Sequence, residues 1–422
     1  MKYRAVRGMH DILPEESWKW QYLEEKIRTF AHRYGFREIR TPMLEYTEVF
    51  QRGVGEGTDI VEKEMYTFLD RGGRSLSLRP EGTAAVVRAY LEHNLGASGT
   101  PVKLYYIAPL FRYDRPQRGR YRQHHQFGAE ILGTPDPAAD AEVLSLPIRL
   151  MQDLGLREVE VHLNSVGDAA CRPRYIAALR EYFGRYLDEL CPDCRRRYDV
   201  NPLRILDCKE ERCHRLTREA PTIFPYLCQE CRNHFEGVQE HLDWLGIRYT
   251  IDPFIVRGLD YYTRTAAEVY SGKLGAQNAM FGGGRYDGLA SQLGGPPVPG
   301  VGFGMGIERL LLVLEEEGIA LPREDGVDVF VATTGKTGHR EAFQLLDQMR
   351  QAGLRADGDP SHRELRAQMK LANRLGARYA VILGEEELRL SMATVRNMAS
   401  GDQERLPLEG LIEALRERIQ KT

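Results

Sequence analysis

Hydrophobic side chains near the start of the chain recur every three or four residues, which is the spacing of one face of an α-helix. Leu23, Ile27 and Phe30 follow this spacing, and Gly35 comes shortly after them. A glycine just beyond the last apolar position commonly ends a helix, because glycine adopts a left-handed backbone without strain. The pattern therefore predicts a helix over residues 15 to 34.

Further along, the pattern changes to strands. Residues 102 to 112 form an apolar run, and a returning segment over residues 124 to 131 carries polar side chains at every second position. Side chains of a strand alternate between its two faces, so Gln126 and Glu130 are expected on one face. If the two strands pair, Arg112 is expected beside them. Several such strands, separated by helices and turns without a repeated strand–helix–strand unit, favour an α+β fold with an antiparallel sheet.

The same patterns divide the chain into four parts. Residues 171–250 are rich in cysteine and arginine and carry helical spacing, so they are interpreted as an inserted helical domain. The parts before and after it, 1–170 and 251–325, carry the strand patterns and are expected to form one core. From 326 to 422, strands and helices alternate regularly, which predicts a separate small α/β domain.

Composition limits the classes of protein to consider. A chain of 422 residues is long enough for two or three domains with cores of their own. Its net charge is −3, so overall charge gives no evidence of a nucleic-acid partner. The charged N-terminus lacks the apolar segment of a secretory signal, and no stretch approaches the roughly 18 apolar residues of a membrane span. We therefore expect a cytoplasmic protein with no membrane contact.

Two segments each place an arginine where a strand or helix end meets an open site. Arg112 ends an apolar strand before an arginine-rich loop, and Arg309 lies in the first turn of a helix expected to begin near Ile307. The planar guanidinium group binds phosphate bidentately and stacks on purines. Together the two arginines predict a nucleoside triphosphate site on an antiparallel sheet. Alternate glycines from 300 to 306 are interpreted as backbone left open to a flat ligand.

These segments resemble conserved motifs of a known family. The run from Phe111 to Ile131 resembles motif 2 of the class II aminoacyl-tRNA synthetases, and the run from Pro299 to Leu310 resembles motif 3. The segment from Arg257 to Arg264 narrows the resemblance to the histidyl-tRNA synthetases, and the strand from Arg37 to Tyr46 is similar to motif 1. The resemblance implies an antiparallel catalytic core with a helical insertion and a C-terminal α/β anticodon-binding domain.

The resemblance also implies a function. It is the ATP-dependent attachment of L-histidine to tRNA(His) through a histidyl-adenylate intermediate, with ATP as substrate and Mg²⁺ as cofactor. Because motif 1 forms the two-fold interface of class II enzymes, a homodimer is implied as well. The alternative is a non-catalytic relative that serves as a histidine-sensing regulatory subunit. Such relatives usually lack the C-terminal domain and lose ATP or tRNA groups, whereas Arg112, Arg257 and Arg309 are all present.

By resemblance, three arginines serve ATP and catalysis. Arg112 would hold the α-phosphate, and Arg257 would stabilise the charge that develops on it in the transition state. Arg309 would stack on adenine or reach the γ-phosphate. Without the resemblance, the returning strand after Arg112 could be an exposed sheet face with ordinary polar residues. The segment that begins at Arg257 could be an edge strand with core tyrosines.

By resemblance, a further group of residues binds histidine. Glu130 would accept a hydrogen bond from the imidazole, and Tyr262 would bond the other ring nitrogen. Glu81 offers a carboxylate to the α-amino group, although its segment also reads as a helix-capping turn in which Thr83 is the expected N-cap. The residues expected to bind histidine are Glu81, Gly82, Thr83, Arg112, Gln126, Glu130, Arg257, Tyr261 and Tyr262.

The expected insertion contains two CxxC pairs. They are Cys191 with Cys194, and Cys228 with Cys231. Thiolates at this spacing clasp one ion tetrahedrally, so the two pairs together are read as ligands of a structural Zn²⁺. Three further residues between the pairs are rival ligands, and free thiols are the alternative. A disulfide framework is not expected in a reducing compartment. The rival ligands are Cys208, Cys213 and His214.

Overall fold

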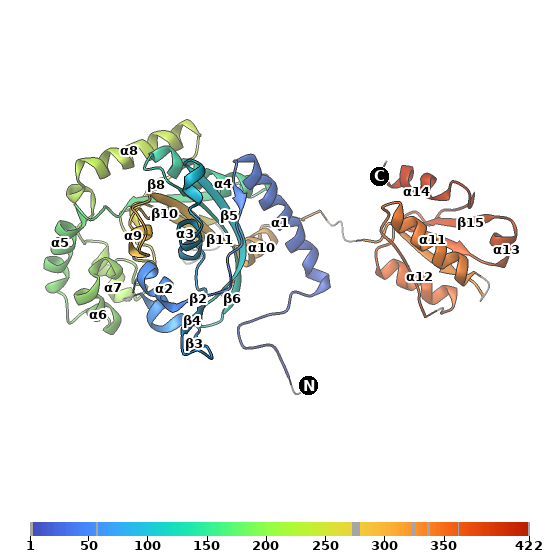
Figure 1. Ribbon diagram of the computed structural model, residues 1–422, viewed down its shortest axis with the longest axis horizontal. Helices are drawn as coiled ribbons and strands as arrows, with labels where there is room; N and C mark the ends of the chain where they lie inside the picture. The colour runs from blue at the N-terminus through green and yellow to red at the C-terminus, as the bar shows by residue number, and fades with distance from the viewer. Residues whose placement is uncertain are drawn as a thin grey trace. The chain divides into compact units, whose positions relative to one another are not determined.

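The computed structural model divides the chain into two compact units (Figure 1). Unit 1 is Met1–Leu321 and unit 2 is Pro322–Thr422. Each unit is described by itself. The residues that the structure describes are 3–55, 58–271, 279–322, 326–335, 338–361 and 363–420.

An eight-stranded sheet forms the centre of unit 1. Its strands are β1 (Arg37–Glu38), β5 (Val102–Phe111), β6 (Gln123–Leu132), β7 (Val159–Ser165), β8 (Thr250–Ile251), β9 (Thr263–Ser271), β10 (Ala279–Arg285) and β11 (Gly300–Gly306). Their order is β1-β5-β6-β11-β10-β9-β7-β8. All neighbours are antiparallel except the outer pairs β1·β5 and β7·β8. The predicted antiparallel α+β core is confirmed.

One face of this sheet is covered by helices. They are α1 (Pro14–Arg33), α4 (Pro137–Asp153), α8 (Gln229–Trp244) and α10 (Ile307–Glu316). Their apolar side chains pack in one buried cluster with the residues of β6 that alternate with the polar ones, Phe127, Ala129 and Ile131. The helix predicted over residues 15 to 34 therefore exists, and its apolar stripe faces the sheet. Alternation along β6 leaves Gln126 and Glu130 on the opposite face.

The opposite face carries less cover. Helix α3 (Thr83–Glu92) and the short helix α9 (Leu289–Gln292) pack there, in a second buried cluster that includes Tyr106 of β5 and Ala266 of β9. Beside them lie helix α2 (Thr47–Val54) and a small antiparallel sheet. That sheet has the order β2-β4-β3, with β2 at Leu44–Tyr46, β3 at Thr67–Leu69 and β4 at Ser75–Leu78.

Helices dominate the chain between β7 and β8. They are α5 (Arg172–Gly184), α6 (Pro192–Val200), η3 (Pro202–Ile205), α7 (Glu211–Thr217), η4 (Phe224–Tyr226) and α8. These elements share a buried cluster of their own, in which most of the cysteines lie. Helix α8 ties them to the sheet, because buried His234 lies 3.1 Å from the Asp140 carboxylate of α4, and Asp140 in turn pairs with buried Arg285.

Unit 2 is a five-stranded sheet with helices. Strands β12 (Val329–Thr333), β13 (Ala356–Gly358), β14 (Tyr379–Leu383), β15 (Met392–Asn397) and β16 (Gln403–Pro407) take the order β13-β12-β14-β15-β16. The helices are α11 (His339–Gln351), α12 (Leu365–Arg374), α13 (Glu385–Arg389) and α14 (Leu411–Gln420). Edge strand β16 is mostly exposed and polar, so no apolar alternation marks it in the sequence. Among the described residues of both units, no helix is long and apolar enough to cross a membrane.

Because each unit has buried clusters of its own, unit 1 is expected to fold without unit 2. A chain that ends at Leu321 should be soluble and should melt cooperatively near the temperature at which unit 1 melts in the full chain. Circular dichroism melts of the two proteins test this. Aggregation of the shorter chain, or a melt without cooperativity, would show that unit 1 needs unit 2 to fold.

Candidate functional site

Glycines on three neighbouring strands make room for polar side chains that lie flat on the sheet. Gly128 of β6 pairs with Gly304 of β11, which pairs with Gly282 of β10. A Cβ atom at Gly282 would lie 2.1 Å from the Arg257 guanidinium group, and one at Gly304 would lie 2.5 Å from the Gln126 side chain. Any larger residue would displace these groups. The protein's own side chains therefore fill space that the sequence suggested was open to a flat ligand.

Two buried carboxylates lie at one end of this polar face. The Glu130 side chain accepts hydrogen bonds from the hydroxyl of Thr83 at 2.7 Å and the hydroxyl of Tyr286 at 2.5 Å. Glu81 accepts from the backbone N–H groups of Thr83 and Ala84, each at 2.8 Å. Glu81 thus caps helix α3. Thr83 was the expected cap, but it is the first helical residue and directs its hydroxyl to Glu130 instead.

Burial governs the protonation of both carboxyl groups. Burial raises the pKa of Glu130 to about 8, although the hydrogen bonds from Tyr286 and Thr83 act in the opposite direction. Burial also raises the pKa of Glu81, against the effect of the two helix N–H groups. A cation placed between the two groups would restore their ionised forms, because an opposite charge favours ionisation. This end of the face is therefore suited to a ligand with an ammonium or imidazole group.

Four buried tyrosines line the same end. The Tyr106 hydroxyl donates to Gln126 Oε1 at 2.9 Å, and the Tyr261 hydroxyl donates to Glu81 Oε2 at 3.3 Å. The Tyr261 ring also lies beside Tyr262, with ring centroids 4.8 Å apart, and beside Tyr286. Burial raises the pKa of all four phenols, so they stay neutral donors. The four are Tyr106, Tyr261, Tyr262 and Tyr286.

Arginines gather at the other end of the face. Arg112 follows β5, and its Nε donates to the Pro80 carbonyl at 2.8 Å. Arg309 lies in the first turn of α10, and its Nη1 donates to the Ala279 carbonyl at 2.7 Å. Backbone carbonyls thus hold both side chains in place while their positive charge stays uncompensated by these contacts.

The arginines at this end repel one another and are partly removed from water, so an anion would bind favourably there. Burial lowers the pKa of Arg309, and the neighbouring Arg120 and Arg112 lower it further. Burial lowers the pKa of His124 to about 3, and Arg112 and Arg309 add to this effect, so the imidazole is neutral. A phosphate group would offset the repulsion among the arginines through charge-assisted hydrogen bonds.

Arg257 lies on the face between the two ends. It forms an ion pair with Glu268 of β9, and its guanidinium group lies 5.7 Å from the centroid of the Tyr262 ring. Burial lowers the pKa of Arg257, but Glu268 and Tyr262 outweigh burial and the net pKa is raised. Within the described part of the chain, its buried Nε has no hydrogen-bond partner. A buried donor of this kind favours an anionic ligand.

The register of the β5·β6 hairpin corrects one prediction. Arg112 was expected beside Gln126 and Glu130. Instead its backbone N–H donates to the Arg122 carbonyl, and Glu130 pairs with Leu104 near the start of β5. Arg112 and Glu130 therefore lie at opposite ends of the strand, and this separation creates the cationic and carboxylate ends.

The loop between β5 and β6 is held by its own ion pairs. Arg120 pairs with Asp114, and the Arg122 guanidinium group lies 3.6 Å from the centroid of the Tyr113 ring. Arg118 lies 2.9 Å from the Glu316 carboxylate of α10. Most of the arginines that make this loop basic are thus partnered within unit 1.

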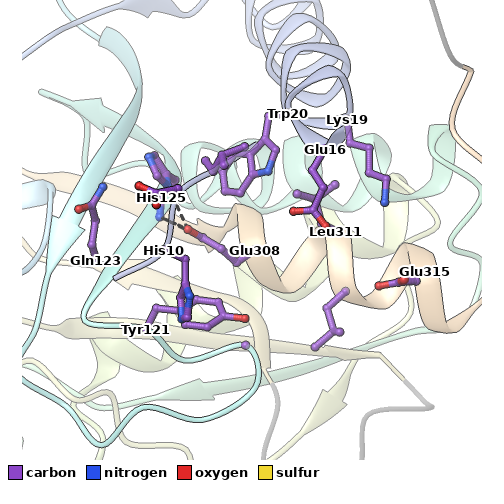
Figure 2. Close-up of a pocket in the computed structure, with 14 residues that line it drawn as sticks. His10, Glu16, Lys19, Trp20, Tyr121, Gln123, His125, Glu308, Leu311 and Glu315 are labelled. Carbon is purple, nitrogen blue, oxygen red and sulfur yellow. Dashed lines mark hydrogen bonds and ion pairs between the residues drawn. The ribbon is translucent and has the colours of Figure 1, made fainter. Parts of the chain in front are cut away.

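A separate pocket of about 370 Å³ lies on the helix-covered side of β6 (Figure 2). Gln123 and His125 line it, together with Trp20 of α1 and Glu308 of α10. The His125 backbone N–H donates to Glu308 at 2.8 Å, and the His125 ring lies edge-on to Trp20. Because Gln123 and His125 alternate with Gln126 and Glu130, this pocket is distinct from the polar face.

The structure does not bring the two CxxC pairs together. Cys191 and Cys194 converge with Cys208 and Cys213, whereas Cys228 and Cys231 converge with Asp168 and Cys171. The expectation of one ion held by both pairs is therefore wrong. The pairs lie at the starts of different helices, with Cys191 capping α6 and Cys228 capping α8. His214, the third rival ligand, belongs to neither group.

Sequence reasoning found most of the polar face and missed some of it. Tyr106 and Tyr286 were missed, as was Glu268. A signal for Tyr106 existed, since pairing the two predicted strands in register places it opposite Gly128. The residues that the structure gathers on or beside the face are Glu81, Gly82, Thr83, Arg112, Gln126, Glu130, Arg257, Tyr261, Tyr262 and Arg309.

This fold and face define a class. A mainly antiparallel sheet with arginines at the hairpin and at the start of the closing helix is the catalytic core of a class II aminoacyl-tRNA synthetase. The family model for histidyl-tRNA synthetase matches residues 8–170 and 201–310, and that for an anticodon-binding domain matches residues 328–418. The chain belongs to the histidyl-tRNA synthetase family.

Relatives agree over the full length. The histidine–tRNA ligase of Caldanaerobacter subterraneus is 53% identical over 99% of this chain and 100% of its own length. That of Moorella thermoacetica is 55% identical over 97% of each chain. Among solved structures, the apo histidyl-tRNA synthetase of S. aureus superposes with a TM-score of 0.84 at 42% identity, covering 98% of this chain and 99% of its own.

The pKa of Glu130 generates a test of the buried carboxylate. Between its ordinary value of 4.5 and about 8, the folded chain keeps a proton that the unfolded chain has lost. Folding stability therefore falls as pH rises through this window. The melting temperature of Glu130→Gln relative to wild type should rise from pH 5 to pH 8.

Thermal melts at several pH values, without ligand, measure this difference. The exposed Glu236 provides a control, since Glu236→Gln should shift the melt equally at each pH. A Glu130→Gln difference that stays constant with pH would show that Glu130 is ionised throughout the range.

Proposed function

We propose that this chain is a histidine–tRNA ligase, which joins L-histidine to tRNA(His) at the expense of ATP. The observation that carries the proposal is the division of one polar face into a carboxylate end and a cationic end. Histidine carries a cationic amino group and an imidazole ring, and it reacts with ATP through its carboxylate. ATP is anionic throughout its triphosphate. The two ends of the face match these two substrates.

At the carboxylate end, the amino group of histidine binds Glu81 and the Thr83 hydroxyl, which flank Gly82. Gln126 of β6 binds the same amino group. Glu130 faces the imidazole and accepts its N–H, because a carboxylate has acceptor sites beyond the two that Thr83 and Tyr286 occupy. Tyr262 bonds the other ring nitrogen. An apolar side chain in this place would leave buried polar groups unpaired, which is how the site rejects it.

At the cationic end, the arginines position ATP. Arg112 and Arg257 bind the α-phosphate, and Arg309 stacks on the adenine or reaches the γ-phosphate. An oxygen of the histidine carboxylate attacks the α-phosphorus in line, and the bond to the bridging oxygen of pyrophosphate breaks. The charge that develops on the α-phosphate meets the guanidinium group of Arg257, which Glu268 already holds in place.

Mg²⁺ fits this end as a cofactor. In nucleotide sites, Mg²⁺ is commonly bound by the phosphates of ATP together with one or two protein carboxylates. Glu64 is a half-buried carboxylate, and burial raises its pKa while nearby Arg112 lowers it. Glu64 would hold the ion, which supplies charge neutralisation for the departing pyrophosphate.

Transfer to tRNA completes the reaction. A hydroxyl of the terminal adenosine attacks the carbonyl carbon of the adenylate, and AMP leaves. Unit 2, which matches the anticodon-binding model, would read the anticodon of tRNA(His). The regulatory alternative is not favoured, because unit 2 is present and all three arginines lie on the polar face. The protein would act in the cytoplasm.

A homodimer is supported by an exposed apolar surface on the small sheet. Tyr46 of β2 and Phe68 of β3 both pair with Leu76 of β4, so their side chains share a face. Leu44 lies two residues before Tyr46 on the same strand and so faces the same way. Tyr46 is 53% exposed and Phe68 is 46% exposed. Exposed apolar side chains that gather on one face are typical of interaction sites. We name this the small-sheet patch: Leu44, Tyr46 and Phe68.

Sedimentation velocity tests the dimer. The wild-type chain should sediment as a dimer at micromolar concentration. Phe68→Asp should shift it toward monomer, because a charge in an apolar interface is left without a partner. Phe343→Asp in unit 2, at a side chain that is 74% exposed, is the matched control and should leave the dimer intact. A wild-type monomer, or a Phe68→Asp dimer of unchanged strength, would contradict the small-sheet interface.

Histidine-dependent exchange of pyrophosphate into ATP tests the function. Exchange should require histidine, and Arg257→Ala should slow it by about a hundredfold, equivalent to roughly 3 kcal/mol of transition-state stabilisation. Histidine binding should change much less. Arg248→Ala, at an exposed arginine, is the control. Histidine binding without any exchange in the wild type would favour the regulatory subunit.

A further inference from the structure

All seven cysteines of the chain lie in two compact groups of four ligands each. The first group contains four buried cysteines, and the second contains three cysteines and one aspartate. In each group one ligand atom from every residue lies within 4.8 Å of the others. The odd cysteine count is thus explained, because an aspartate takes the eighth place. Group 1 is Cys191, Cys194, Cys208 and Cys213, and group 2 is Asp168, Cys171, Cys228 and Cys231.

The spacing within group 1 matches a tetrahedral metal site. A Zn–S distance of about 2.3 Å gives a sulfur–sulfur edge of roughly 3.8 Å in a tetrahedron. The sulfur atoms of Cys191 and Cys208 lie 3.8 Å apart. Cysteines that served only as apolar packing would have no reason to point four thiols at one point.

Backbone groups around group 1 favour sulfur in its thiolate form. The Cys191 sulfur accepts the backbone N–H of Cys194 at 3.4 Å, and the Cys213 sulfur accepts the N–H of Cys191 at 3.2 Å. Cys191 also caps helix α6, whose N-terminus stabilises negative charge. Such donors are the usual outer shell of a cysteine-bound metal.

Group 2 carries the same features independently. The sulfur atoms of Cys171 and Cys231 lie 3.8 Å apart, and the Asp168 carboxylate lies 3.4 Å from the Cys171 sulfur. Cys228 caps helix α8, and its sulfur accepts the backbone N–H of Cys231 at 3.5 Å. Three thiolates and one carboxylate are also a ligand set that zinc accepts.

The chain between two ligands of group 1 supports the polar face. Arg204 is buried, and its Nη1 donates to the Arg257 carbonyl at 2.8 Å. Asn201 donates to the Asp260 carboxylate at 3.1 Å. An ion bound by Cys194 and Cys208 would fix both ends of this segment, and with it the backbone that carries Arg257.

We propose that group 1 holds a structural Zn²⁺ through four thiolates, and that group 2 holds a second Zn²⁺ through three thiolates and Asp168. Zinc suits both because it takes four ligands, accepts thiolates and has no redox chemistry. The first ion would connect α6 with α7, and the second would connect the start of α5 with α8. The first ion also anchors the segment beneath Arg257.

Metal analysis of the untagged full-length chain, purified without chelators, tests both sites. Wild type should contain two zinc ions per chain. Cys208→Ser and Cys228→Ser should each contain one, and the double variant none. Cys213→His should keep its zinc where Cys213→Ser loses it, because three cysteines and one histidine also bind zinc. The Cys213→His and Cys213→Ser variants change the same residue. A difference in their zinc content therefore reports on ligand chemistry even if other serine variants fold poorly.

Cobalt substitution identifies which site is affected. Cys208→Ser should lose the thiolate-to-cobalt absorption of a four-sulfur site, and Cys228→Ser should keep it. Loss of both ions in either single variant would show that the two groups do not bind zinc independently and would overturn the assignment. If the wild type contained one zinc that Cys208→Ser lost and Cys228→Ser kept, group 1 would stand as a zinc site and group 2 would not. A metal-free wild type with an unchanged melting temperature after zinc addition would overturn both sites.

Discussion

The polar face depends on the absence of side chains at glycines on three adjacent strands. Glu130, Gln126 and Arg257 lie flat against the sheet, and a Cβ atom at Gly302 would lie 1.7 Å from the Glu130 carboxylate. The sheet can hold these groups in place only where it carries no side chain of its own. Helices on the opposite face supply the apolar packing that keeps the strands in register.

This arrangement separates opposite charges along one hairpin. Glu81 and Glu130 are buried with hydroxyl and backbone donors, whereas Arg112 and Arg309 are half-buried among other cations. Each end is unfavourable when empty, because each holds groups whose charge is removed from water. A cationic amino group bound at one end and a phosphate group bound at the other would relieve both. Burial of these groups therefore favours ligands that carry the complementary charges over ligands that do not.

The sequence predicted the elements and much of the face, because alternation and helical spacing are local properties. The helix over residues 15 to 34 and the strand ending near Arg112 are present within a residue or two. The predictions that were wrong depended on which residues lie next to one another in space. Alternation gives the face of each side chain but not its partner on the next strand, so Arg112 was expected beside Glu130. In the hairpin, Phe111 pairs with Gln123 and Leu104 pairs with Glu130. The cysteines were grouped by sequence motif, whereas the fold of the segment between β7 and β8 brings Cys208 and Cys213 to one CxxC pair and Asp168 and Cys171 to the other.

The two-ended face is tested most directly by calorimetric titration of the full chain with three ligands. Histidine and histidinol, which lacks the carboxylate, both keep the groups that Glu81 and Glu130 would bind. Imidazolepropionate keeps the carboxylate but lacks the amino group. We expect histidine and histidinol to bind and imidazolepropionate to bind far more weakly, because it leaves Glu81 without a cation. Imidazolepropionate that bound as tightly as histidine would contradict the carboxylate end as the site of the amino group.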